Sequence, residues 1–288
     1  MESKLQRRGL RTARSALGLC CLLLLIACSR GAATESSAVL SVLRDGQLVR
    51  QLHREQLGTP RLTEAWDPYY NKNKTFLAVP LSPVLKSGFA GLELAGQEIL
   101  LRAKDGYTVP LPADRLLEPG AYLALADRSS AMEEWEPIGP QRADPRPFYL
   151  FWTGADQRSL ETHPRPWQLV AVELLRFEQR FPHVLPTGMP SEDRAWRGLR
   201  VFADLCIRCH AINREGGRVG PDLNVPQSIV EYRPVEKIRQ YIVDPRRFRY
   251  GNMPAHPQLS KDDLDALLAY FFAMKTRKFD PDSTQDTP

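Results

Sequence analysis

Cysteine is scarce in this chain, and its distribution excludes several kinds of site. Of the five cysteines among 288 residues, Cys20, Cys21 and Cys28 lie near the start, and only Cys206 and Cys209 follow. Two later thiols, separated by two residues, provide no disulfide framework for a fold. A structural zinc site would need a second ligand pair, and no further cysteine is available to form one.

The sequence also lacks a long hydrophobic run and a marked excess of one charge. Residues 16–27 form an apolar run of twelve residues, which as a helix is too short for a hydrocarbon layer of about 30 Å. The first 27 residues hold +4 of the formal net charge of +5. The remainder is nearly neutral, so nucleic-acid binding loses its main electrostatic support.

The N-terminal residues are typical of an export signal, because a basic start precedes the short apolar run. The run ends in residues 25–28 (LIAC), which resemble the lipobox of bacterial lipoproteins. This resemblance implies a signal peptide over residues 1–28, lipidation of Cys28, and a polar tether over residues 29–38. We therefore expect a location in the periplasm of a Gram-negative bacterium, with a lipid anchor in a membrane. Simple signal cleavage and an uncleaved anchor are the alternatives.

The motif C-x-x-C-H at residues 206–210 is the clearest chemical signal in the chain. Two thiols at this spacing can add to the two vinyl groups of one porphyrin, and His210 is then held under the iron as the proximal ligand. We expect one haem c, covalently attached at Cys206 and Cys209. A redox-active thiol pair shares the C-x-x-C spacing and stays as an alternative.

Residues 39–181 consist mostly of short apolar segments separated by turn residues, a pattern that predicts an α+β, mainly β domain. The expected strands are residues 99–103, 107–111, 122–126, 148–152 and 169–175, and the expected single helical turns are residues 81–86 and 113–117. Pro110 weakens the second of these strands. The aromatic residues of 148–152 are expected in the core. Prolines in residues 182–190 predict a linker.

Three segments of this domain resemble the molybdopterin-binding fold of sulfite-oxidase-type enzymes: residues 105–112, 124–127 and 139–142. In that family a cysteine sulfur binds molybdenum. Residues 39–189 contain no cysteine, so the family's metal ligand matches no position here. The resemblance therefore implies a degenerate domain that keeps the fold without the cofactor and serves for docking.

From Ser191 the apolar period becomes helical, and residues 191–279 resemble a small class I cytochrome c, followed by a flexible tail over residues 280–288. Gly198, Phe202 and Cys206 share one helical stripe, and Ser191 is available as the N-cap. The resemblance implies that the glycine permits close crossing by the last helix. The fold class is thus an α+β domain followed by an all-α domain.

The last helix is expected to begin at Ser260, with Asp263 completing a capping box. Its predicted buried face holds Leu264, Leu267, Leu268, Phe271 and Met274.

The resemblance to class I cytochromes also implies the haem environment. Residues 220–223 (GPDL) match a family element whose proline carbonyl accepts the Nδ1 proton of the proximal histidine, a role that falls to Pro221. Residues 250–254 (YGNMP) resemble the methionine loop, which makes Met253 the expected axial iron ligand opposite His210 and Tyr250 a candidate haem contact. His256 is the rival ligand. A thioether ligand raises the reduction potential relative to a second histidine.

These patterns together predict a periplasmic, membrane-tethered electron carrier that exchanges electrons with redox partner proteins. Arg246, Arg247 and Arg249 are a candidate docking patch for an acidic partner, and a solvated face is the plain alternative. With both axial positions of the iron filled, an enzyme is not expected. The rival functions are a molybdopterin-dependent oxidoreductase, a haem-based gas sensor from which Met253 dissociates, and a purely structural lipoprotein.

Overall fold

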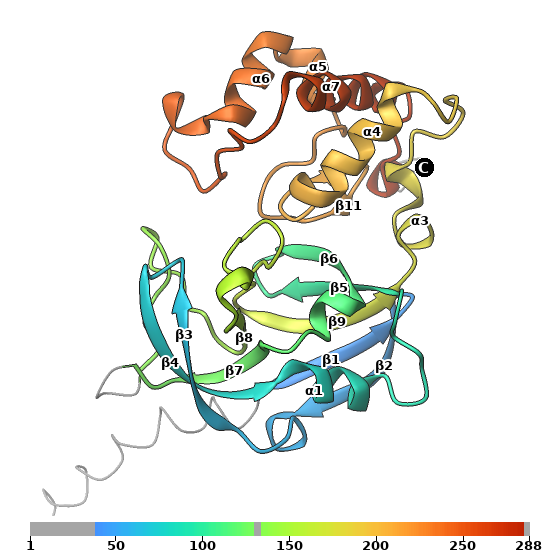
Figure 1. Cartoon of the computed structure of the whole chain (residues 1–288). Helices are drawn as coiled ribbons and strands as arrows, with labels where there is room; N and C mark the ends of the chain where they lie inside the picture. Colours follow the sequence, from blue (N-terminus) through green and yellow to red (C-terminus); the bar gives the residue numbers. More distant parts are fainter. Residues whose placement is uncertain (1–37, 130–133, 285–288) are drawn as a thin grey trace, which may run out of the picture. The chain divides into compact units, whose positions relative to one another are not determined.

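The computed structural model describes residues 38–129 and 134–284, which form strands up to Leu175 and mainly helices from Phe177 (Figure 1). The prediction of a β-rich region followed by a helical one is therefore confirmed. The expected signal peptide, Cys28 and nearly all of the tether lie outside the described residues. Within those residues, no helix combines the length and the apolar character needed to cross a bilayer.

One sheet of the β-rich region has five strands in the order β2-β1-β9-β5-β6. Its strands are β1 (Val39–Arg44), β2 (Gln47–His53), β5 (Glu98–Ala103), β6 (Thr108–Pro112) and β9 (Leu169–Leu175). Strands β1 and β9 are parallel, and the other pairs are antiparallel. Pro110 lies in β6 opposite Leu100, and its missing N–H is tolerated because β6 is at the edge of the sheet.

A second sheet has four antiparallel strands in the order β3-β4-β7-β8. They are β3 (Arg61–Asp67), β4 (Lys72–Pro80), β7 (Ala121–Asp127) and β8 (Tyr149–Trp152). All four residues of β8 are at most 1% exposed, which agrees with the predicted place of these aromatic residues in the core. The sequence patterns did not predict β1 to β4.

Helices α1 (Leu81–Gly88) and α2 (Ala113–Leu116) occur where helical turns were expected. Each buries aliphatic side chains in the main core of the β-rich region, with Leu81, Leu85 and Leu116 fully buried. Burial of such a side chain contributes about 1.5–3 kcal/mol. The shorter elements of this region are η1 (Arg54–Gln56) and η2 (Ala155–Gln157), and helix α3 (Phe177–Arg180) follows β9 at the start of the helical part.

The predicted linker begins with the 3-10 turn η3 (Pro182–Val184). Val184 is fully buried in the hydrophobic cluster of the helical region. Its carbonyl oxygen accepts a hydrogen bond of 2.8 Å from the hydroxyl of Tyr270. This part of residues 182–190 thus packs as a component of the helical core.

The helical region contains two helices that cross, together with several other elements. Its elements are α4 (Arg194–Val201), the π-helical turn η4 (Phe202–Cys206), β10 (Ala211–Ile212), β11 (Glu215–Gly216), α5 (Ile229–Tyr232), α6 (Val235–Val243), η5 (Pro245–Arg247), α7 (Lys261–Lys275) and η6 (Pro281–Thr284). A Cβ atom at Gly198 in α4 would collide with the backbone carbonyl of Ala266 in α7. The absence of a side chain at Gly198 is therefore what lets the helices approach.

The start of α4 differs from the expectation. Asp193 is the N-cap, and its carboxylate accepts a hydrogen bond of 2.8 Å from the N–H of Ala195. Ser191 was the wrong candidate, because its hydroxyl donates to the neighbouring carboxylate of Glu192 instead. A charged acceptor also interacts favourably with the positive end of the helix dipole.

The start of α7 agrees with the expectation. The N–H of Ser260 donates to the Asp263 carboxylate and the N–H of Asp263 donates to the Ser260 hydroxyl, each at 3.1 Å, which forms the predicted capping box. The five side chains predicted for the inner face of α7 are all buried.

Candidate functional site

The C-x-x-C-H residues form a tight turn at the end of the α4 helix. The N–H of Ile207 donates to the carbonyl of Phe202 at 2.8 Å, which widens the last turn to a π-helical one. The N–H groups of Cys209 and His210 then both donate to the carbonyl of Cys206, at 3.1 and 2.9 Å. The backbone thus folds both cysteines and the histidine into one compact unit.

Both thiols are partly buried and free. Burial raises the pKa of Cys206 to about 12 and that of Cys209 to about 11. A redox-active thiol pair normally needs the opposite shift, because the thiolate is the reactive form. The surroundings of these thiols therefore differ from those of a C-x-x-C redox centre.

The imidazole of His210 is held from one side by the predicted residue Pro221. Its Nδ1 atom lies 2.8 Å from the Pro221 carbonyl oxygen. Because a carbonyl only accepts, Nδ1 must carry the proton and Nε2 keeps its lone pair for a metal. Burial lowers the pKa of His210, while the bond to Pro221 opposes that shift.

Gly220 lies against the same ring, so closely that a Cβ atom there would overlap the imidazole. Its N–H donates to the carbonyl of Cys209 at 2.7 Å. Residues 220–221 therefore both orient the histidine and fasten to the motif, as the partners of a ligating histidine commonly do.

Met253 is partly buried and packs against the same hydrophobic cluster as Cys206. Tyr250, three residues earlier, is fully exposed and is not part of that cluster. His256 is partly buried, and burial lowers its pKa. Its backbone N–H is tied to the carbonyl of Ile242 at 3.1 Å. Both candidate sixth ligands thus remain near the helical core.

Several apolar side chains of this cluster are only partly buried, although the helices beneath them are closely packed. They are Cys206, Leu223, Ile229, Val230, Met253 and Leu259, among others. A large apolar group could cover such side chains, and a C-x-x-C-H turn provides the atoms to attach a porphyrin. The residues present therefore fit a haem group.

Two buried asparagines support this site, and the sequence patterns did not reveal them. The side-chain N–H₂ of Asn213 donates to the carbonyls of His183 and Arg277, each at 2.8 Å. The side-chain N–H₂ of Asn224 donates to the side-chain oxygen of Asn213 and to the carbonyl of Met274, again at 2.8 Å. They fasten the loop after His210 to the end of α7. Asn213 adopts the left-handed backbone conformation, which asparagine tolerates better than most residues. An asparagine suited to a turn was therefore the only local signal that the sequence offered for this position.

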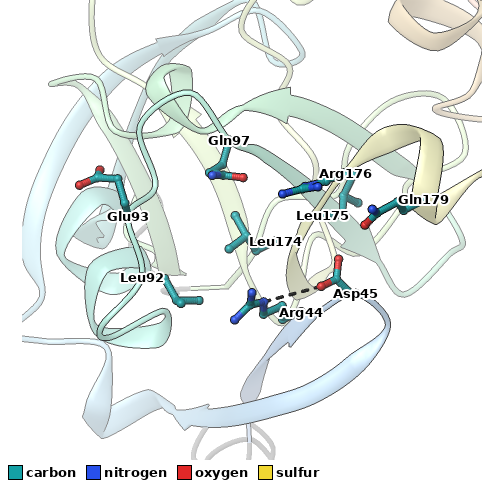
Figure 2. A pocket seen from close by; sticks show the side chains of 9 residues that line it. All are labelled: Arg44, Asp45, Leu92, Glu93, Gln97, Leu174, Leu175, Arg176 and Gln179. Carbon is teal, nitrogen blue, oxygen red and sulfur yellow. Dashed lines mark ion pairs between the residues drawn. The ribbon is translucent and has the colours of Figure 1, made fainter.

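A separate hollow of about 410 Å³ lies in the β-rich region (Figure 2). Arg44 at the end of β1 and Asp45 directly after it line this hollow and form an ion pair of 3.6 Å, and both side chains are more than half exposed. None of the residues predicted to bind haem lines this hollow.

The segments that resemble a molybdopterin-binding fold are dispersed over the β-rich region. Residues 105–112 form a turn and β6, residues 124–127 end β7, and residues 139–142 form the turn between the bridged residues Ile138 and Ala143. In residues 38–129 and 134–284, no three histidine, cysteine, aspartate or glutamate side chains are grouped to hold a metal ion.

Comparison with known proteins identifies the helical region. Residues 195–274 match the family model for cytochrome c. Cytochrome c oxidase subunit 2 of Alkalihalophilus pseudofirmus is 36% identical over 93 residues, which amount to 30% of this chain and 27% of that protein. The chain thus spans about a quarter of the length of this relative. Residues 195–274 form a cytochrome c domain, which implies a haem c cofactor and supports a haem-containing electron-transfer protein.

Proposed function

We propose that this chain is a periplasmic electron carrier, tethered to a membrane through Cys28, in which one haem c is bound covalently to Cys206 and Cys209. The iron is ligated by His210 and Met253. The observation that carries the proposal is the C-x-x-C-H turn with its histidine oriented by Pro221, within a region that matches cytochrome c.

The haem supplies reversible one-electron chemistry when it is bound. Cys206 and Cys209 would form its two thioether links. His210 would offer Nε2 to the iron, and the hydrogen bond from Nδ1 to Pro221 would fix the ring and increase its donor strength.

Met253 is the preferred ligand opposite His210. It shares a hydrophobic cluster with Cys206, and a soft, uncharged thioether favours reduced iron and so raises the reduction potential. His256 is the alternative, although its backbone bond to Ile242 ties it to the end of α6. If His210 and Met253 both bound the iron, no open position would remain for a substrate or a gas, which favours a carrier over an enzyme or a gas sensor.

The covalent attachment is tested by changing Cys206 and Cys209 to Ser together. Haem should stay with the wild-type polypeptide through denaturing electrophoresis and be lost from the double variant. Haem that is retained by the denatured double variant would refute attachment through these thiols.

The ligand assignment is tested by Met253→His, with Met189→Leu as the matched control. Both methionines are partly buried against the same cluster. Met253→His should keep the haem and lower its reduction potential in a voltammetric titration, whereas the control should not. An unchanged potential in Met253→His would remove Met253 from the iron.

The partner is proposed to be an acidic redox protein that docks beside the methionine loop, residues 250–254. Arg246, Arg247 and Arg249 are exposed there, next to the exposed rings of Phe248 and Tyr250. Charge steering by such a patch raises encounter rates, and redox interfaces are small. The similar protein from Alkalihalophilus pseudofirmus is a cytochrome c oxidase subunit, so a cytochrome c oxidase is one candidate partner.

The tether and the β-rich region complete the proposal. Wild-type protein should incorporate labelled fatty acid and Cys28→Ala should not, and a variant that still incorporates the label would contradict lipid anchoring through this residue. For the β-rich region we propose a sulfite-oxidase-like fold that holds no molybdenum cofactor. Stoichiometric molybdenum in the purified protein would overturn that part and favour the oxidoreductase.

A further inference from the structure

The turn between β5 and β6 lies against the haem-attachment motif. The N–H of Thr108 donates to the carbonyl of Arg208 at 2.9 Å, and the N–H of Arg218 donates to the carbonyl of Gly106 at 2.9 Å. Strand β6 is at the edge of its sheet, and the N–H of Thr108 bonds to Arg208 rather than to β5. The motif thus occupies hydrogen-bonding positions that an edge strand otherwise leaves open.

The side chain of Arg208 adds a second attachment point. Arg208 stands between the two cysteines of the motif, and its guanidinium donates to the carbonyls of Leu160 and Glu161 at 3.3 and 2.8 Å. The rigid fork of a guanidinium suits two neighbouring acceptors better than the single ammonium of lysine. Tyr107 lies in the same contact, where burial raises its pKa to about 12 and Arg208 opposes that rise.

Apolar and loop contacts extend this attachment beyond the motif. Leu100 and Leu175, from adjacent strands β5 and β9, are buried in the hydrophobic cluster of the helical region. Asn252, the residue before Met253, donates to the side-chain oxygen of Gln141 at 2.7 Å. The β-rich region therefore contacts both the attachment motif and the methionine loop.

We infer that the β-rich region is a built-in dock for the haem-attachment motif, with Arg208 as the positioning residue. The dock consists of residues 105–108 and 160–161 on one side and residues 208 and 218 on the other. This inference deepens the proposed function. It rests on that function only in taking the C-x-x-C-H motif to be the place where haem is attached. The dock covers the outer side of the C-x-x-C-H turn with this chain's own backbone. A redox partner must consequently approach elsewhere, where Arg246, Arg247 and Arg249 remain exposed.

The test compares amide hydrogen exchange, resolved to single residues, in the full-length haem-loaded protein and in Arg208→Ala. Exchange at Thr108 should accelerate at least threefold, while Val172 in β9 and Leu267 in α7 keep their rates. A smaller change at Thr108 would overturn the dock. Equal acceleration at all three amides would also overturn it, because that pattern reports a general loss of stability.

Two further variants separate the dock from a local effect of charge. Arg200→Ala, on the exposed side of α4, is the matched control and should leave the Thr108 rate unchanged. Thr108→Pro removes the N–H donor at an edge position that tolerates proline. It should accelerate exchange at Arg218, and an unchanged Arg218 rate would contradict the paired contact.

The outcome for the dock is distinguishable from that for haem attachment. The wild-type protein and Arg208→Ala both keep Cys206 and Cys209, so haem attachment is the same in the two proteins whose Thr108 exchange is compared. If the wild-type protein carried no covalent haem, the proposed function would fail. The exchange rate at Thr108, compared between wild type and Arg208→Ala, would still test whether the dock exists.

Discussion

The β-rich region and the cytochrome domain close their cores differently. In the β-rich region even charged groups are sealed inside with partners: Lys74 and Asp127 are both at most 1% exposed and form a salt bridge of 2.6 Å. In the cytochrome domain, apolar side chains around Cys206 and Met253 are left partly buried. The first region pairs its buried charges with its own residues, whereas the second presents apolar surface beside a C-x-x-C-H turn that a bound group can cover.

The largest predicted effect follows from removing the haem that would complete the cytochrome domain. In the Cys206→Ser, Cys209→Ser variant we expect the cytochrome domain to lose stability while the β-rich region keeps its own. A ligand present at 1,000 times its dissociation constant contributes about 4 kcal/mol, and the loss should be at least of that order. Urea unfolding followed by amide exchange in α7 and β9 measures both regions separately. Equal loss in the two regions would abolish the distinction drawn between them.

The next effect tests the sealed charges of the β-rich region. Lys74→Met leaves the Asp127 carboxylate buried without its cation, which should lower the free energy of unfolding by about 3 kcal/mol, the low end for a broken buried pair. The low end applies because the N–H groups of Ser129 and Glu136 still donate to Asp127. Adding Asp127→Leu should recover much of the loss. Urea unfolding checks both variants, and a neutral Lys74→Met would contradict the role of the pair.

The same pair sets a pH dependence. Burial alone would raise the pKa of Asp127, but hydrogen bonds from Lys74 and Ser129 bring it below its ordinary value. A carboxyl whose pKa is depressed on folding stabilises the protein above its unfolded pKa, about 3.9. That contribution disappears as the pH falls through the lower folded value. The acid unfolding of the β-rich region should therefore be less steep in Lys74→Met.

A smaller effect is expected where α4 crosses α7. Gly198→Ala would place a methyl group against the backbone of Ala266, and such overpacking costs about 2 kcal/mol. The loss should be confined to the cytochrome domain. Gly251→Ala is the control, because its new Cβ would meet no atom within 4 Å. The midpoints of urea unfolding compare the two variants. Equal midpoints would mean that α4 and α7 accommodate the added methyl group without loss of stability.

The parts of the molecule that sequence predicted are those whose partners lie close along the chain. The C-x-x-C-H turn closes within five residues, and the capping box of α7 joins Ser260 to Asp263. Helix α7 was recognised from its apolar spacing together with that start signal. The bond between His210 and Pro221 spans only eleven residues, and a family resemblance indicated it.

Features that depend on distant partners were not predictable from the pattern. Strand β1 pairs with β9, so that Val42 lies beside Val172, and nothing near either residue specifies the other. Strand β2 exposes every residue except Leu52, which leaves no apolar alternation to detect. The contact between Thr108 and Arg208 likewise joins two regions of the chain through backbone groups, which any sequence possesses.

The smallest predicted effect concerns the helix start that the sequence pattern assigned to the wrong residue. Asp193→Ala removes the acceptor for the N–H of Ala195 and should destabilise the cytochrome domain by about 1 kcal/mol, as N-cap loss typically does. Ser191→Ala is the matched control and should have almost no effect, because its hydroxyl bonds only to the exposed Glu192. Thermal unfolding of the haem-loaded protein compares them. A larger loss of stability in Ser191→Ala than in Asp193→Ala would restore Ser191 as the N-cap. The expected order would show that the charged residue nearest the first helical turn, rather than the first hydroxyl after the prolines, determines where α4 begins.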